Sequence, residues 1–483
     1  MSIKIKAAGF LILLVFTAGA PTSSKQSPQY PSIVFTRVTV IDATGAAAKP
    51  SMTVVIIGDR ISEIGKSEKV HVPVNAKVID ASGKFLIPGL WDMHVHWNHK
   101  EYLPLFTANG VTGVRIMIGL PIHQVWRKEI EGGTLLGPRM VIASPSVDGP
   151  NPVSRYSVRV SNEKEARQAV SKLREDGADF IKVYSLIPRD AYFALADAAI
   201  KQKIPFAGHV PRSVTVAEVS DSGQRSIEHL SGFAFAASAR EIEVEAELVE
   251  LRKALAAGGN YLMLLRRLEA KHLDFYDGRK AAALFKRLHK NGTWQCPTLV
   301  TMRGSAFLDD PTFTNDLRLK YLPATLRTNW KPQNHNVYRN ARAADYAAMK
   351  KILNKQLEIV RAARSAGVQF LAGTDVTNPY CFPGFSLHDE LELLVRAGLT
   401  PLEALQTATL NPAKYLGLLN TLGTVEKGKI ADLVLLDKNP LTDIANTKRI
   451  NAVMMAGKLI LKSDLEAMLA KVEATATRSE HGN

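Results

Sequence analysis

The hydrophobic pattern of this 483-residue chain is the same at its two ends and different in between. Residues 32–85 and 420–465 contain short runs of alternating apolar and polar side chains, such as SIVFTRVTVID, which are typical of half-buried β-strands. In MTVVIIGDRISEIG, the pair Gly58-Asp59 separates two such runs and predicts a β-hairpin. We therefore expect one composite β-sandwich domain built from both ends of the chain.

The middle of the chain, residues 86–419, alternates apolar runs with amphipathic helical patterns such as EKEARQAVSKLREDG. This alternation favours βα units and a parallel sheet. The apolar runs are 90–96, 111–117, 139–147, 179–185, 204–210, 225–230, 293–300 and 369–376. Eight βα units predict an α/β fold of the (β/α)8 TIM-barrel type, in which functional side chains lie at the C-terminal ends of the strands.

Two longer helical stretches interrupt this pattern, at about 233–290 and 303–345. Both exceed the 2–6 residues that are usual for a βα loop. We expect them to extend over the mouth of the barrel as a lid or to decorate its surface, and the sequence leaves both open. Residues 466–483 are expected to form a C-terminal helix or tail.

The first residues have the pattern of a secretory signal peptide, which we assign to residues 1–20. Lys4 and Lys6 precede the apolar run GFLILLVF, and small residues follow it. The run is too short to span a bilayer, and residues 21–31 are expected to be a flexible leader. The sequence therefore predicts export to the periplasm or the extracellular space, with no stable membrane span after signal removal. An uncleaved anchor is the alternative.

The charge and the cysteine content narrow the classes of partner. The 61 Lys and Arg exceed the 46 Asp and Glu, but the excess of +15 is scattered and no basic block alternates with aromatic residues. We therefore expect a small-molecule substrate rather than nucleic acid, and a homo-oligomer remains open. Cys296 and Cys381 give no disulfide framework, so the sequence leaves open whether they pair.

Histidines spaced two residues apart, His94 and His96, end the apolar run in LIPGLWDMHVHW. In an extended strand these side chains point to the same face, so both imidazoles can bind one metal ion. Lys182 lies in the apolar strand DFIKVYS, where burial lowers the pKa of an amine. A neutral lysine amine can react with carbon dioxide to form a carbamate, an anionic ligand that can bridge two metals.

Further candidate ligands end other predicted strands: His209 in IPFAGHV, His229 in SIEHL and Asp375 in FLAGTDV. Each of them alone is more typical of a structural residue. Together with His94, His96 and Lys182, they lie at the same end of the predicted barrel, where side chains converge. The nitrogen and carboxylate ligands indicate a metal site, with zinc as the best match.

The segments PGLWDMHVHW, FIKVYS, FAGHV, SIEHL and LAGTDV resemble the metal-dependent amidohydrolase superfamily, in its imidazolonepropionase-like and Xaa-Pro dipeptidase (prolidase)-like branch. The resemblance implies two divalent metal ions, zinc being the expected metal. It implies that one ion is held by His94, His96 and Asp375, the other by His209 and His229, and that carboxylated Lys182 bridges them.

The expected activity is that of an exported metal-dependent hydrolase that cleaves a C–N bond in a dipeptide or an N-acyl amino acid. In this hypothesis metal-bound hydroxide attacks the carbonyl group, and Asp375 acts as general base and then as general acid. The alternatives are an esterase, lactonase or phosphotriesterase at the same binuclear centre, and a non-catalytic envelope binding protein. Arg155, Trp97 and Tyr184 are the predicted substrate contacts, although packing or surface roles are more typical of such residues.

Overall fold

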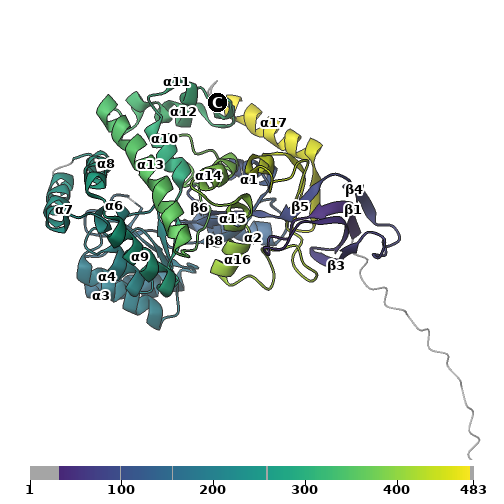
Figure 1. Ribbon diagram of the computed structural model, residues 1–483, viewed down its shortest axis with the longest axis horizontal. Coiled ribbons are helices and arrows are strands. Elements are labelled where there is room, and N and C mark those ends of the chain that lie inside the picture. Colours follow the sequence, from purple (N-terminus) through teal and green to yellow (C-terminus); the bar gives the residue numbers. More distant parts are fainter. Residues whose placement is uncertain (1–31, 98, 155, 257–258, 479–483) are drawn as a thin grey trace, which may run out of the picture.

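The computed structural model describes residues 32–478, except residues 98, 155 and 257–258 (Figure 1). The predicted signal peptide and leader, residues 1–31, thus lie outside the described residues. Figure 1 shows a large part in which helices surround a set of short strands, and a smaller β-rich part beside it. None of the helices described is both long and apolar enough to cross a membrane.

The β-rich part is one eight-stranded sheet with the order β17-β16-β15-β5-β1-β2-β3, and β4 pairs with β1. Its strands are β1 (Ser32–Val40), β2 (Lys49–Ile57), β3 (Arg60–Lys66), β4 (Lys77–Asp80), β5 (Phe85–Pro88), β15 (Leu433–Leu436), β16 (Ile450–Met455) and β17 (Lys458–Leu461). The predicted hairpin is confirmed, since β2 and β3 are antiparallel and Ile57 lies opposite Arg60. β15 lies antiparallel to β5, so both ends of the chain build one β-domain, as predicted.

The first seven predicted barrel strands form parallel pairs. They are β6 (Leu90–Val95), β7 (Val111–Ile116), β8 (Arg139–Ile142), β11 (Ile181–Val183), β12 (Phe206–Gly208), β13 (Ser226–Glu228) and β14 (Trp294–Cys296). The short strands β9 (Val147–Asp148) and β10 (Val158–Arg159) pair beside β11. A bridge between Ala143 and Phe180 joins the two groups of strands.

The eighth predicted strand, residues 369–376, is not a continuous strand. It closes the barrel through isolated parallel bridges, from Phe370 to Gln295 on one side and from Val376 to Val95 on the other. A Cβ atom on Gly373 would lie 2.5 Å from the Sγ atom of Cys296, so the chain here passes too close to its neighbour for a side chain. Glycine at this position allows the segment to lie close to Cys296 and His94 and to complete the ring.

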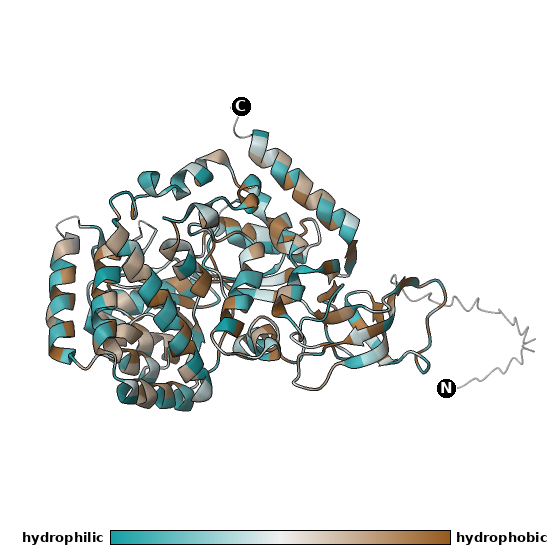
Figure 2. Ribbon diagram, turned by 45° about the horizontal axis from the view of Figure 1, so that its top comes forward, coloured by the Kyte–Doolittle hydropathy of each residue, from teal (hydrophilic) through white to brown (hydrophobic). Residues whose placement is uncertain are grey.

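The helices follow the strands as expected for βα units, and Figure 2 shows hydrophilic and hydrophobic residues alternating around the outer helices. The outer helices are α1 (Leu103–Ala108), α2 (Pro121–Glu131), α3 (Glu163–Glu175), α4 (Arg189–Lys201), α5 (Val216–Asp221), α9 (Gly278–Asn291), α13 (Ala343–Ser365), α14 (Phe385–Arg396), α15 (Pro401–Thr407) and α16 (Leu410–Leu416). Helix α17 (Lys462–Arg478) forms the C-terminal helix and packs on α1.

The two predicted insertions are helical. The first contains α6 (Phe233–Ala236), α7 (Glu241–Ala256) and α8 (Tyr261–His272), and the second contains α11 (Pro311–Thr314) and α12 (Ala324–Trp330) after α10 (Leu299–Ala306). Short 3-10 helices are η1 (Lys100–Tyr102), η2 (Leu273–Phe275), η3 (Leu317–Tyr321), η4 (Pro332–Asn334) and η5 (Ile444–Lys448).

The barrel strands are buried on both faces, and every residue of β6, β7 and β11 is buried. A polar side chain in such a strand loses its contact with water, so it needs a partner within the protein or a bound ligand. Polar residues are nevertheless present in these strands and cluster toward one point, which is the candidate site described next.

Candidate metal centre

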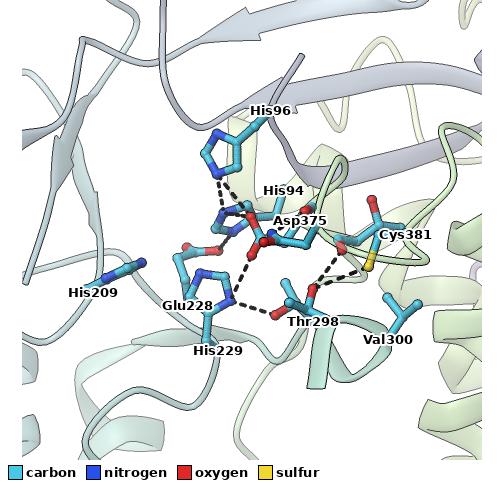
Figure 3. Close-up of polar contacts among 12 residues, drawn as sticks. His94, His96, His209, Glu228, His229, Thr298, Val300, Asp375 and Cys381 are labelled. Carbon is cyan, nitrogen blue, oxygen red and sulfur yellow. Dashed lines mark hydrogen bonds and ion pairs between the residues drawn. The ribbon is translucent and has the colours of Figure 1, made fainter. Parts of the chain in front are cut away.

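Three ligand atoms form a tight triangle at the end of β6. The Nε2 atoms of His94 and His96 lie 3.1 Å apart, and the Oδ1 atom of Asp375 lies 3.3 Å from the first and 3.1 Å from the second (Figure 3). Two ligands bound at about 2.1 Å to one ion lie roughly 3.0–3.4 Å from each other at tetrahedral or octahedral angles. The spacing of these atoms is therefore the spacing that a metal ion requires.

His229, at the end of β13, extends this group on its other side. Its ring centroid lies 4.6 Å from that of His94, and its Nδ1 atom lies 3.8 Å from the Oδ2 atom of Asp375. The ring of His209 lies 5.0 Å from that of His229, on the side away from His94 and His96 (Figure 3). The Nδ1 atom of His209 is hydrogen-bonded to the Ser185 hydroxyl at 2.8 Å. The predicted histidines thus form a continuous row across the barrel mouth.

Lys182 lies in β11 with its side chain completely buried. Its Nζ atom has no hydrogen-bond partner among the described residues, which leaves a polar atom in the core without compensation. Burial lowers the pKa of Lys182 to about 8. Its charge also contributes to the lowered pKa of His96, His209 and His229, of which burial is the largest cause. In the sheet, Lys182 lies opposite Ala207 of β12, the strand that leads to His209.

The protonation states match the needs of a metal ion. Burial lowers the pKa of His96 to about 4 and that of His229 to about 3, and burial lowers the pKa of His209 well below its usual value. Burial acts to raise the pKa of Asp375, but His229 and His94 hold it well below its usual value. Neutral imidazoles and an ionised carboxylate are the forms that bind divalent metals, so the donor set fits such an ion.

Several residues at the site have left-handed backbone conformations, which are uncommon for residues other than glycine. The φ angles are +64° at His229, +48° at Thr298 and +55° at Asp375. The Thr298 hydroxyl is hydrogen-bonded to the Nδ1 atom of His229 at 2.6 Å. Such conformations cluster at functional sites, where the surrounding structure holds them. Here they turn the chain at the strand ends that carry the ligands.

Three buried charged groups at the site were missed by the sequence analysis. Glu228 contacts His94, Arg115 contacts Glu228, and Asp92 accepts a hydrogen bond from the Thr374 hydroxyl at 2.6 Å. Burial raises the pKa of Asp92 to about 7. The sequence signal that could have indicated them is a charged residue inside an otherwise apolar strand. The strands are LWDMHV, VTGVRI and SIE, which contain Asp92, Arg115 and Glu228 in that order.

The predicted substrate contacts occupy different environments. Tyr184 stacks on His209 with ring centroids 4.3 Å apart, beside the site. Trp97 is 5% exposed and packs against Phe106 and Trp126, so its ring belongs to the barrel core rather than to the wall of an open pocket. Arg155 lies outside the described residues, and its role stays a prediction.

Residues after β13 contact segments that carry candidate ligands, while a lid role of the insertions stays a prediction. Tyr261 of α8 receives a hydrogen bond from the Nε atom of Arg212 at 3.0 Å. Tyr338 is 5% exposed, burial raises its pKa, and its hydroxyl lies 2.7 Å from the Ser305 hydroxyl. Gln356 of α13 donates a hydrogen bond to the carbonyl oxygen of His229 at 3.3 Å.

The two cysteines are separate, buried thiols. The Sγ atom of Cys381 contacts the Thr301 hydroxyl at 3.8 Å. Burial raises the pKa of both thiols, so neither has the thiolate character of a reactive cysteine.

Comparison with known proteins decides the family. The model of the amidohydrolase family matches residues 85–460. The chain belongs to the amidohydrolase family. The prediction of an amidohydrolase-type enzyme with the TIM-barrel fold is thereby confirmed at this level.

Individual amidohydrolases show how far the likeness extends. An imidazolonepropionase from Pseudomonas savastanoi pv. phaseolicola is 41% identical over 91 residues, which cover 19% of this chain and only 22% of that protein. One from Psychromonas ingrahamii is 24% identical over 402 residues, which cover 81% of this chain and 88% of that protein.

Solved structures support the fold. A bottromycin amidohydrolase has a TM-score of 0.71 at 24% identity and covers 93% of this chain and 91% of its own. A Xaa-Pro dipeptidase with bound methionine in the active site has a TM-score of 0.63 at 20% identity, and the match covers 89% of this chain and 100% of that chain. At these identities the likeness shows the fold and leaves the substrate of the present amidohydrolase to be argued from its own site.

Proposed function

We propose that this amidohydrolase is an exported metal-dependent hydrolase that cleaves the C–N bond of a small substrate with a free carboxylate, such as a dipeptide or an N-acyl amino acid. The observation that carries the proposal is the triangle formed by His94, His96 and Asp375, which is completed by His229. Its place at the C-terminal ends of the barrel strands is where substrates bind in this type of fold.

Two divalent metal ions, best matched by zinc, fit the donor set. His94, His96 and Asp375 would hold one ion, and His209 and His229 the other. When bound, these ions polarise a carbonyl group and make a water molecule more acidic. The unpartnered Nζ atom of Lys182 supports its carboxylation, in which the amine nitrogen bonds to the carbon of carbon dioxide and releases a proton. The resulting buried anion would have the two ions as its partners and bridge them.

Asp375 is the proposed general base and acid. Its Oδ1 atom faces His94 and His96, whereas its Oδ2 atom points toward His229 without a hydrogen bond to it. This second oxygen can accept a proton from the attacking water. The same oxygen can then return the proton to the leaving amine nitrogen, which an amide requires and an ester requires less.

Arg212 is the group that supports a substrate carboxylate. It follows His209 by three residues, and its charge contributes to the lowered pKa of that histidine, of which burial is the largest cause. In the described part of the chain its guanidinium forms no ion pair, and the nearby Glu269 is paired with Arg266. The side chain also lines a cavity of about 820 Å³ beneath α7, whose lining contains none of the candidate metal ligands. The support for a carboxylate therefore comes from a guanidinium with free donors three residues after His209.

Replacing Arg212 by Met should weaken the binding of substrates that carry a free carboxylate. Loss of a charge-assisted hydrogen bond predicts a rise in KM of about 10- to 100-fold, with a smaller change in kcat. Steady-state kinetics with a substrate and its carboxamide analogue checks this, because the analogue should be almost unaffected. The matched control is Arg189→Met, since Arg189 lines the same cavity but is already paired with Glu218. Equal losses for acid and carboxamide would remove Arg212 from carboxylate recognition.

Export depends on residues 1–20, in which two lysines precede an apolar run. Expression of the full chain in a bacterium should give a shortened mature protein in the periplasmic or extracellular fraction. Fractionation and mass spectrometry of the N-terminus check this. Full-length protein confined to the cytoplasm would refute export and leave the proposed chemistry intact.

The activity itself is tested by metal analysis of the purified protein and a library of dipeptides and N-acyl amino acids. We expect about two divalent ions per chain and amide hydrolysis that chelators abolish and zinc restores. Hydrolysis of ester, lactone or phosphotriester analogues alone would favour the alternative chemistry at the same centre. Substrate binding without turnover in the metal-loaded protein would favour a binding protein.

A further inference from the structure

We propose that Glu228 and Arg115 form a buried pair that fixes the orientation and the tautomer of His94. One Glu228 oxygen, Oε2, lies 2.7 Å from the Nδ1 atom of His94 (Figure 3). The Nη2 atom of Arg115 donates to both oxygens of Glu228 at 3.0 Å. The side chains of all three residues are 0% exposed, so water does not compete for these contacts.

The pair is itself held rigidly from several strands. The Nε atom of Arg115 donates to the carbonyl oxygen of Met93 at 2.6 Å, next to His94 in the chain. Its Nη1 atom donates to the hydroxyls of Ser226 at 3.0 Å and Tyr415 at 3.1 Å. Arg115 therefore connects β7 with β6, β13 and α16, and it places Glu228 with little freedom to move.

The contact with Glu228 determines which nitrogen of His94 is available. An ionised carboxylate only accepts hydrogen bonds, so the Nδ1 atom of His94 must carry the proton. The Nη2 atom of Arg115 donates to both oxygens of Glu228, as expected for an ion pair with a carboxylate. The Nε2 atom then keeps its lone pair, and this is the atom that faces His96 and Asp375. A carboxylate on the far nitrogen of a metal-binding histidine also makes that histidine a more basic ligand.

The contacts of Glu228 also distinguish between two groups of residues that could hold a metal ion. Besides the group of His94, His229 and Asp375, the ligand atoms of His94, Glu228 and Cys296 lie within 4.8 Å of one another. Both oxygens of Glu228 are already occupied, Oε1 by Arg115 and the Ser226 hydroxyl and Oε2 by Arg115 and His94. We therefore assign Glu228 to positioning rather than to metal binding.

A purely structural role is the alternative, because Arg115 and Glu228 also join strands. A buried ion pair adds little net stability compared with apolar residues of the same size, so stability alone is a weak reason for one here. The two roles differ in what they predict for His94. Positioning predicts one defined tautomer and a defined metal environment, whereas strand joining predicts only a change in melting temperature.

The first measurement uses the wild-type apoprotein, and one variant serves only to assign the signal. Nitrogen-15 NMR of histidine side chains should show a slowly exchanging proton on Nδ1 of His94, which His94→Asn identifies by loss of the signal. A proton on Nε2 instead would overturn the proposal. This measurement involves neither substrate nor metal, so its result is independent of the proposed catalytic activity.

The second measurement compares Glu228→Gln with Tyr415→Phe as the matched control. Tyr415→Phe removes the hydroxyl that contacts Arg115 and Ser226 but leaves Glu228 on His94. Titration with Zn²⁺ should show affinity about 10- to 100-fold lower for Glu228→Gln and within about threefold of wild type for the control. The visible spectrum of the Co²⁺-loaded protein should change only for Glu228→Gln. Equal metal affinity and equal spectra in both variants, or the same losses in both, would show a structural role.

Discussion

Replacement of Asp375 by Asn should leave most of the bound metal in place and lower kcat for amide substrates by about 10²- to 10⁴-fold. The amide side chain of Asn keeps the size of Asp and one oxygen at the position that faces His94 and His96. It has no oxygen that can accept a proton from water and return it to a leaving nitrogen. Metal analysis and steady-state kinetics with an amide substrate check the two halves of this expectation.

An ester of the same acid provides the internal comparison for this variant. Its alcohol leaving group needs protonation less than an amine does, so the loss for the ester should be smaller by about tenfold or more. Undiminished amide hydrolysis with full metal content would remove Asp375 from proton transfer. Loss of the metal together with the activity would instead assign Asp375 to metal binding alone.

Replacement of Lys182 by Ala should reduce the metal content from two ions to one or fewer per chain. Lys182 is fully buried beside the histidine row, and its Nζ atom has no hydrogen-bond partner among the described residues. If its carbamate bridges the two ions, removal of the amine removes a ligand from both at once. Metal analysis by mass spectrometry of the dialysed protein measures the outcome.

Lys182→Met is the matched control, because Met fills the buried space but has no amine that can react with carbon dioxide. Both variants should lose metal to the same degree if the carbamate is responsible. A loss in the Ala variant alone would point to the cavity that the substitution leaves. Added formate should restore part of the metal content of the Ala variant, because a small carboxylate fits the vacated space. Two retained ions in both variants would contradict the bridging role.

The ligand-bearing strands could be predicted because local pattern and barrel geometry agree. His94, His209 and His229 each end a short apolar run, and parallel strands in a barrel bring such ends together. The composite β-domain could be predicted for a similar reason, since both chain ends share one alternating pattern. The break in the eighth strand could not, because the residues packed against Gly373, which include Cys296, are distant in the sequence.

The residues that contact the candidate metal ligands could also not be predicted from the local sequence pattern. Arg115 and Glu228 are separated by 113 positions, and nothing in either strand alone shows that they meet. Arg212 could not be predicted, because a single arginine three residues after a strand end carries no local signal and its contacts with Tyr261 and the cavity come from distant segments. Trp97 follows a ligand closely in the sequence, yet its ring packs in the core because neighbouring helices cover it.

The sheet shared by both chain ends has a consequence for biosynthesis. β5 receives its antiparallel neighbour β15 only after the ribosome has completed the entire barrel sequence. Until then the edge of β5 exposes unpaired backbone N–H and C=O groups, which in other proteins can pair with another chain and cause aggregation. Nascent chains that stop before Leu433 would keep this edge open, so chaperone binding during synthesis should be strongest for such truncated forms and end once β15 has emerged.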